Sequence, residues 1–284
     1  MTIEMSAMQV LAPAKINLSL KVLARRPDGF HEIETLIAPI SLRDEIKIDK
    51  KAGGQGTNFR CDDAAVPQGE DNLVVRAANL FFKTTKLSPA VSIELRKKIP
   101  HAAGLGGGSS DAASTLLGLN QLFETKLSRE NLGEMAAKIG SDVSYFIFES
   151  AAICRGRGEV VSPTKLAKKL SILLLKPGFG VATSFAYSHW EDSKELPGIS
   201  YAPQDLDGVR FVNDLERPVF AKFVFLARLK TWLLKQPEVG VALMSGSGST
   251  MFAVLREKEH VDLVAERAKA EIDPELWTCA CETR

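Results

Sequence analysis

The sequence has few cysteines, almost no net charge and no long apolar run. Its 284 residues include four cysteines, none in a C-x-x-C pair, so neither a zinc site nor a disulfide framework is predicted. Lysine and arginine number 36 against 35 aspartates and glutamates, which leaves no excess charge to attract nucleic acid. No apolar run is long enough to span a membrane, and the N-terminus lacks the basic and apolar regions of a signal peptide. These absences favour a cytoplasmic protein without nucleic-acid or membrane partners.

Four common nucleotide-binding or catalytic motifs are also missing. No Gly-Lys dipeptide occurs, which excludes a Walker A loop, and no G-x-G-x-x-G occurs, which excludes the dinucleotide fingerprint and the protein-kinase glycine loop. Neither H-R-D nor the G-x-S-x-G elbow of hydrolases is found. A phosphate-binding loop in this chain must therefore be of another kind.

Hydrophobic periodicity predicts strands and helices along the whole chain. Strands are expected at 10–23, 40–50, 91–100, 168–177, 239–255 (two strands joined by a glycine-rich turn) and 276–283. Helices are expected at 71–86, 111–123, 127–140, 182–190, 212–235 and 259–272. The pattern restarts after about residue 160, so we expect a mixed α/β fold of the α+β type with two domains, 1–160 and 161–284.

Single residues mark where several of these helices begin, end or break. Asp71 or Asn72 would cap the N-terminus of the helix at 71–86, and Ser128 would cap the N-terminus of the helix at 127–140. Gly140 would end the helix at 127–140, and Pro218 would break the helix at 212–235.

The strand at 10–23 alternates apolar and polar residues. Ile16 and Leu18 face one way, and Lys15 and Asn17 face the other. Period two of this kind predicts a half-buried strand.

The densest glycine run is HAAGLGGGSS, from residue 101 to 110, between a predicted strand and a predicted helix. A helix start offers free N–H groups and a partial positive charge, and glycines let phosphate oxygens approach the backbone. One or two glycines would suffice for a tight turn and a helix cap. Four of them favour a phosphate cradle over that alternative, with Ser109 and Ser110 as further hydroxyl donors.

The blocks PAKINLSL, IPHAAGLGGGSSDAAS, GSDVSYFI and MSGSGST resemble the superfamily of galactokinase, homoserine kinase, mevalonate kinase and phosphomevalonate kinase (GHMP kinases). The resemblance implies a two-lobed GHMP-kinase fold. Its N-terminal lobe would resemble domain 2 of ribosomal protein S5, its C-terminal lobe would be ferredoxin-like, and the active site would lie between them.

Four further blocks, RRPDGFHEIET, EDNLVVRAAN, GVATSFAY and FVNDLERPVF, resemble one branch of this superfamily. All blocks occur in the order of that branch from residue 12 to about 254. The resemblance implies an ATP-dependent kinase that phosphorylates the 2-hydroxyl of a cytidyl-diphosphate-linked methylerythritol, in the non-mevalonate route to isoprenoid precursors.

The resemblance implies a catalytic pair, Asp142 of GSDVSYFI and Lys15 of PAKINLSL. An aspartate base must reach the hydroxyl proton that it takes. The lysine would keep this carboxylate ionised and would neutralise charge on the transferred group. Asn17 would lie near the pair and the substrate.

ATP is the implied co-substrate, and Mg²⁺ would arrive with its phosphates. Asn72 matches a position near the adenine, and its alternative role is the helix cap. Ser110 is a candidate magnesium ligand, but the metal ligands themselves stay open. The implied ATP-binding residues are Asn72, Pro100, Ala103, Gly104, Leu105, Gly106, Gly107, Gly108, Ser109 and Ser110.

The resemblance implies that Phe30 and His31 bind the cytidyl substrate. The Phe30 ring would stack on the cytosine, and His31 would hydrogen-bond to the edge of the base. Many relatives of this branch carry tyrosine where this chain has Phe30, a change that keeps stacking but removes a hydroxyl. Tyr187 matches a second aromatic residue and Thr183 a substrate-contacting hydroxyl, and the alternative for Tyr187 is an ordinary core residue.

A second glycine loop, Gly246, Ser247 and Gly248, would close beside the phosphates, or be a flexible hairpin turn. Asn213 and Asp214 match a block of the branch without a specific role beyond shaping the pocket.

Two alternatives stay open. The chain could be another GHMP-type kinase, for mevalonate or homoserine, although Phe30, His31 and Tyr187 favour a substrate with a nucleobase. It could also be a non-catalytic nucleotide-binding or RNA-binding module, against which the near-zero net charge and the retained Lys15 and Asp142 argue. We expect a small-molecule substrate and a monomer or weak homodimer.

Overall fold

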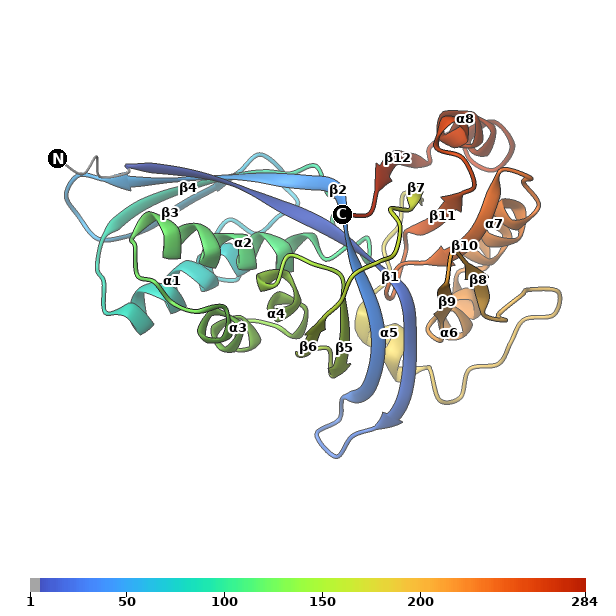
Figure 1. The fold of residues 1–284 in the computed structure, drawn as a ribbon, viewed down its shortest axis with the longest axis horizontal. Coiled ribbons are helices and arrows are strands. Elements are labelled where there is room, and N and C mark those ends of the chain that lie inside the picture. Colours follow the sequence, from blue (N-terminus) through green and yellow to red (C-terminus); the bar gives the residue numbers. More distant parts are fainter. Residues whose placement is uncertain (1–5) are drawn as a thin grey trace. The chain divides into compact units, whose positions relative to one another are not determined.

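A computed structural model describes residues 6–284 (Figure 1). The chain forms two compact units. The first comprises the chain up to Ala14 with Leu42–His101 and Gly106–Glu149, and the second comprises Lys15–Ser41, Ala102–Leu105 and Ser150–Arg284. Two long strands, β1 (Ala7–Arg25) and β2 (His31–Lys51), contribute to both units. The predicted domain boundary at residue 160 stays a prediction.

The first unit is a sheet with helices on one side (Figure 1). Besides β1 and β2 it contains β3 (Gly56–Cys61), β4 (Ala90–Arg96), α1 (Leu73–Thr85), α2 (Gly107–Leu122), α3 (Arg129–Ala137) and α4 (Ser141–Ile147). The strands follow the order β3-β4-β2-β1, with β3 parallel to β4 and β2 antiparallel to β4.

Local sequence signals position these elements as expected. Alternate residues of β4, namely Val91, Ile93 and Leu95, are buried. The Asn72 side chain accepts a hydrogen bond from Val74 N at 2.8 Å and so caps α1. Ser128 caps α3 in the same way, accepting from Asn131 N at 3.2 Å. The helix expected at 127–140 is shorter than predicted, because α3 ends at Ala137 and Gly140 directly precedes α4.

The second unit contains a mixed sheet and an antiparallel sheet. The strands added here are β5 (Ala152–Gly156), β6 (Val160–Pro163), β7 (Ser171–Lys176), β8 (Gln204–Leu206), β9 (Val209–Asn213), β10 (Val239–Met244), β11 (Met251–Leu255) and β12 (Trp277–Glu282). In the mixed sheet, β5 pairs with β2 and β6, while β9 pairs with β1 and β8. The antiparallel sheet has the order β10-β11-β7-β12. The helices of the second unit are α5 (Thr183–Ser188), α6 (Glu216–Lys222), α7 (Val224–Leu234), a 3₁₀ turn (Lys258–His260) and α8 (Val261–Glu271).

Helices α6, α7 and α8 cover the apolar face of the antiparallel sheet. Leu173 and Ala253 from the strands pack in one cluster with Leu229 of α7 and Val264 of α8. The helix expected at 212–235 begins only at Glu216, because residues 212 and 213 belong to β9. It breaks at Phe223 between α6 and α7, so the predicted break at residue 218 is wrong. Proline fits the first turn of α6, where backbone N–H groups have no partner within the helix.

The architecture is therefore mixed α/β. Among the described residues, no helix is long and apolar enough to cross a membrane.

Candidate active site

A buried lysine and asparagine lie side by side on β1. Only 5% of Lys15 and 3% of Asn17 are exposed, although both lie on the polar face of the strand. The middle of β1 is thus buried on both faces, and the prediction of a half-buried strand is wrong there. Lys15 Nζ donates to Asn17 Oδ1 at 2.6 Å, and Asn17 Nδ2 donates to Thr35 Oγ1 at 2.8 Å. Thr35 in turn donates to Ser19 O at 2.6 Å, so a chain of hydrogen bonds orients the lysine.

The first half of the glycine run lies against this strand. Lys15 N donates to Leu105 O at 3.0 Å. Gly104 has φ +73°, and a Cβ there would lie 2.2 Å from Ser245 O. The Ser245 hydroxyl donates to Gly104 O at 3.0 Å. Gly104 is therefore required twice, by its backbone conformation and by the close approach of the loop that follows β10.

The second glycine loop closes on the same group of residues. A Cβ on Gly246 would lie 3.2 Å from both Lys15 Nζ and Asn17 Oδ1. The hydroxyls of Thr183 and Ser247 are 3.0 Å apart and share a hydrogen bond. The second unit thus brings together Lys15, Asn17, Thr183 and the predicted loop, all of which the sequence analysis names.

An aromatic group forms at the start of β2 and on α5. The rings of His31 and Tyr187 stack with centroids 5.5 Å apart, and Trp190 meets His31 edge-on at 6.0 Å. Phe30 is 52% exposed and lies under the Arg157 guanidinium, 4.9 Å from the ring centroid. Trp190 follows the end of α5 and is absent from the residues predicted for the site, although the helix expected at 182–190 places it three residues from Tyr187.

The second half of the glycine run begins α2 in the first unit. Gly106 precedes the helix with φ +71°, and the helix starts at Gly107. Gly108 is exposed and Ser109 is half-buried. Ser110 is fully buried, and within the described part of the chain its hydroxyl has no hydrogen-bond partner. Free N–H groups at the helix start and an unpaired hydroxyl beside them form a site suited to an anion.

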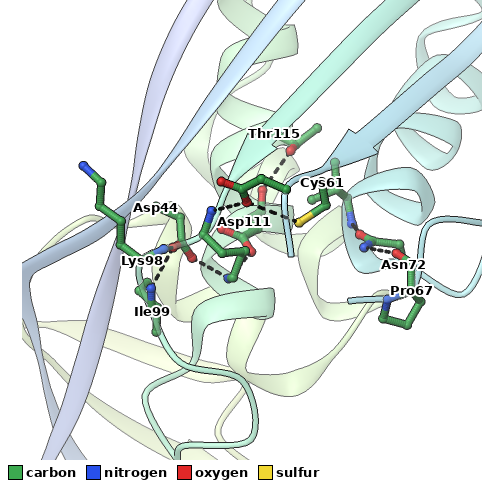
Figure 2. A network of polar contacts seen from close by, with 11 residues as sticks. Asp44, Cys61, Pro67, Asn72, Lys98, Ile99, Asp111 and Thr115 are labelled. Atoms are coloured by element: carbon green, nitrogen blue, oxygen red, sulfur yellow. Dashed lines mark hydrogen bonds and ion pairs between the residues drawn. The ribbon is translucent and has the colours of Figure 1, made fainter. Parts of the chain in front are cut away.

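Both polar atoms of the Asn72 side chain form hydrogen bonds within the fold. Its oxygen caps α1, and its Nδ2 donates to Pro67 O at 2.7 Å (Figure 2). The cap is confirmed, and the role near the adenine stays a prediction, as does the role of Pro100.

A buried ionic network supports the start of α2. Lys97 Nζ donates to Asp111 Oδ2 at 2.8 Å and also to Asp44 Oδ2. Asp44 accepts from the backbone N–H of Ile99 at 2.9 Å (Figure 2). A Cβ on Gly107 would lie 3.2 Å from Lys97 Nζ, so the ammonium lies directly beneath the first turn.

Two carboxylates share one ammonium in this network. Burial raises the pKa of Asp111 to about 8, and the negative charge of Asp44 acts in the same direction while Lys97 opposes it. Nothing in the sequence distinguishes these three residues, since Lys97 and Asp44 each lie between other charged residues.

Asp142 lies in the first turn of α4 and is exposed. A carboxylate at this position is favoured by the free N–H groups of the helix start. Asp142 belongs to the first unit and Lys15 to the second, so their action as a pair stays a prediction. Within the described residues, no group of three or more His, Cys, Asp or Glu side chains could hold a metal ion.

Comparisons with known proteins give consistent matches. Two family models match, GHMP kinases N terminal domain over residues 72–150 and GHMP kinases C terminal over residues 204–273. A 4-diphosphocytidyl-2-C-methyl-D-erythritol kinase from Methylacidiphilum infernorum is 40% identical over 94% of this chain and 93% of the relative. One from Citrifermentans bemidjiense is 37% identical over 94% and 95%.

Solved structures match over nearly the whole chain. A crystal structure of 4-(cytidine 5'-diphospho)-2C-methyl-D-erythritol kinase has a TM-score of 0.80 at 34% identity, covering 97% of this chain and 99% of its own. A homoserine kinase from Cytophaga hutchinsonii has a TM-score of 0.75 over 100% and 96% of the two chains. At 16% identity, that second likeness shows the fold alone.

Proposed function

Because this chain belongs to the 4-diphosphocytidyl-2-C-methyl-D-erythritol kinase family of GHMP kinases, we propose specific roles for its residues in that reaction. It is an ATP-dependent phosphotransferase with an alcohol acceptor and a small-molecule substrate. The predicted family and the α/β GHMP-kinase fold are confirmed. The observation that carries the proposed roles is the buried Lys15–Asn17 pair against the loop at Gly246.

In the transfer step, the 2-hydroxyl of the substrate attacks the γ-phosphorus, and the bond from that phosphorus to the leaving oxygen of ADP breaks. Asp142 accepts the hydroxyl proton. The Lys15 ammonium, fixed by Asn17, stabilises the charge on the transferred group. Little covalent chemistry is asked of the protein, so positioning and charge supply most of the rate enhancement.

The triphosphate lies at the start of α2. Backbone N–H groups from Gly106 to Ser109 donate to phosphate oxygens, since the N–H of Ser110 already bonds to Gly106 O. The residues present fit a magnesium ion held mainly by phosphates and water, because Ser110 offers a buried, unpaired hydroxyl oxygen. When bound with ATP, this ion would neutralise phosphate charge.

The cytosine is recognised by the aromatic group of His31, Tyr187 and Phe30. Support comes from the stacking of His31 with Tyr187 and from the exposed ring of Phe30. The phenylalanine keeps the stacking surface that a tyrosine would offer, and Thr183 supplies a hydroxyl beside Ser247.

A cytoplasmic monomer or weak homodimer, without nucleic-acid or membrane partners, completes the proposal. Its support is the net charge of +1 and the four cysteines, none of which forms a disulfide in the described part of the chain.

Turnover of ATP by the purified protein tests the proposal. With Mg²⁺, we would supply 4-diphosphocytidyl-2-C-methyl-D-erythritol, mevalonate and homoserine separately and identify each product by mass. We expect phosphorylation of the cytidyl substrate alone. Phosphorylation of mevalonate or homoserine would contradict the aromatic site, and ATP binding without any turnover would contradict the catalytic roles.

A further inference from the structure

Asn213, the last residue of β9, is almost fully buried and uses every hydrogen-bonding group of its side chain. Only 4% of the residue is exposed. Its Nδ2 donates to Met244 O at 2.7 Å and to Gly246 O at 2.8 Å. Its Oδ1 accepts from Leu215 N at 3.0 Å. Two carbonyls on one side and an N–H on the other leave only one orientation for this amide.

The two carbonyls belong to the segment that carries the phosphate-side loop. They lie on either side of Ser245, whose hydroxyl donates to Gly104 O. Gly246 is also the residue whose α-carbon faces Lys15 Nζ and Asn17 Oδ1. A shift of this backbone would therefore change the surroundings of the lysine directly.

The same segment is held from a second direction. Glu216 Oε1 accepts from Met244 N at 2.9 Å, and its other oxygen accepts from Lys230 Nζ at 2.5 Å. Both charged residues are about 1% exposed. The peptide groups of Met244 are thus held through both their N–H and their C=O.

Asn213 and its neighbour also hold β1, the strand of Lys15. Asn213 is in register with Leu20, and Asp214 N donates to Leu20 O at 3.0 Å. The Asp214 carboxylate accepts from Val22 N at 2.9 Å. One short segment therefore binds both the strand that carries the lysine and the loop that faces it.

We infer that Asn213 is a positioning residue for phosphoryl transfer, which fixes the loop at Gly246 against Lys15. The inference rests on the roles given to Lys15 and to that loop under the proposed function. It assigns Asn213 no contact with substrate. Its loss leaves the reacting groups present but displaced, and displacements of about 1 Å can cost about 100-fold in rate.

Gln204 offers a matched control on β8, the strand that pairs with β9. Its Nε2 donates to Ala242 O at 2.9 Å and its Oε1 accepts from Ala242 N at 3.0 Å. Gln204→Ala therefore removes two hydrogen bonds to β10, two residues before the segment that Asn213 holds. It should lower the melting temperature without changing catalysis.

The experiment compares Asn213→Ala, Asn213→Asp and Gln204→Ala in the full chain. For Asn213→Ala we expect kcat to fall about 100-fold while KM for the cytidyl substrate stays within about threefold. Asn213→Asp places a carboxylate against two carbonyls, and a protonated acid would restore one donor. Its kcat relative to the parent should therefore rise as the pH falls from about 8 to about 6.

Hydrogen exchange provides a readout that does not need turnover. Asn213→Ala should speed exchange of the amides at 245–249, while Gln204→Ala should not. Two results would overturn the positioning role of Asn213. One is a kcat of Asn213→Ala within about twofold of the parent, and the other is an equal loss of kcat in Asn213→Ala and Gln204→Ala. If the parent chain has no kinase activity but the exchange result holds, the proposed function fails and the clamp on the loop stands.

Discussion

The ammonium nitrogen of Lys15 lies 2.6 Å from Oδ1 of Asn17, and both side chains are buried. Burying a charged amine costs free energy unless hydrogen bonds compensate it, so an apolar residue at this position would serve the strand better. The cost is tolerated where the charge has a task. This pair therefore distinguishes the middle of β1 as a site rather than as part of the core.

Lys15→Met tests that conclusion by keeping the length of the side chain and removing its charge. We expect kcat to fall by at least about 100-fold, because charge stabilisation of the transferred group is lost. The melting temperature should stay unchanged or rise, since a buried charge is removed. Steady-state kinetics and thermal unfolding on the same preparation check both. A variant that is unstable and still active would contradict the catalytic role.

Asp142→Asn removes the proposed base while keeping its shape. We expect kcat to fall by about 10²- to 10⁴-fold with ATP affinity unchanged. Glu130→Gln is the control, because Glu130 also lies in the first turn of its helix. Kinetics and nucleotide titration of the two variants decide the matter. Near-normal turnover in Asp142→Asn would contradict the assignment.

Much of the fold is predictable from local sequence, because burial and period coincide there. Val91, Ile93 and Leu95 alternate in sequence and are all buried in β4. The caps Asn72 and Ser128 are predictable because a side-chain oxygen there satisfies a free N–H group of the helix. The break expected at residue 218 fails because proline is tolerated in a first turn.

The site is less predictable, because its contacts join residues far apart in sequence. Alternation predicts that Lys15 is exposed, whereas in the structure it is buried, with Leu105 bonded to its backbone and the loop at Gly246 against its ammonium. Lys97 and Asp111 are unremarkable in sequence and meet only when α2 packs on the sheet. The residue types of the site can thus be read from motifs, while their burial and partners cannot.

Phe30→Ala tests the recognition of the base. Loss of one stacking surface should raise KM for the cytidyl substrate by about 5- to 150-fold, given about 1–3 kcal/mol per stacked base. KM for ATP should change far less, and Phe30→Tyr should behave like the parent. Initial rates with each substrate varied in turn measure both constants. Equal weakening of the two substrates would show that the base site is misplaced.

Gly104→Ala tests the close approach of the two glycine loops. A Cβ there would lie 2.2 Å from Ser245 O, which the backbone cannot accommodate without moving. Gly53→Ala is the matched control, because Gly53 has a similar φ of +75° and nothing within 4 Å of the added atom. Both variants carry the strain of a left-handed residue, about 1–2 kcal/mol. Because only Gly104→Ala also brings a Cβ against Ser245 O, only that variant should lose most of its kcat. Comparable kinetics in the two variants would contradict the argument.

The raised pKa of Asp111 should make the stability of the protein depend on pH. Its pKa is raised to about 8 in the folded protein, mainly by burial, against about 3.9 in an unfolded chain. Between these values the folded state holds a proton that the unfolded state has released. The free energy of unfolding therefore decreases as the pH rises, by up to about 1.4 kcal/mol per pH unit, and this contribution levels off above pH 8. Asp111→Asn cannot ionise, so its stability should fall less steeply over the same range.

Urea unfolding from about pH 5.5 to 8.5 measures these slopes. Asp71→Asn is the control, because Asp71 is an exposed carboxylate beside the start of α1 and should leave the slope of the parent unchanged. Glu216 contributes in the same direction as Asp111, since burial raises the pKa of its carboxyl, so the parent and Asp111→Asn must be compared rather than the parent alone. Equal slopes in those two proteins would show that Asp111 stays ionised beside Lys97, and that the network under α2 carries a net negative charge at neutral pH.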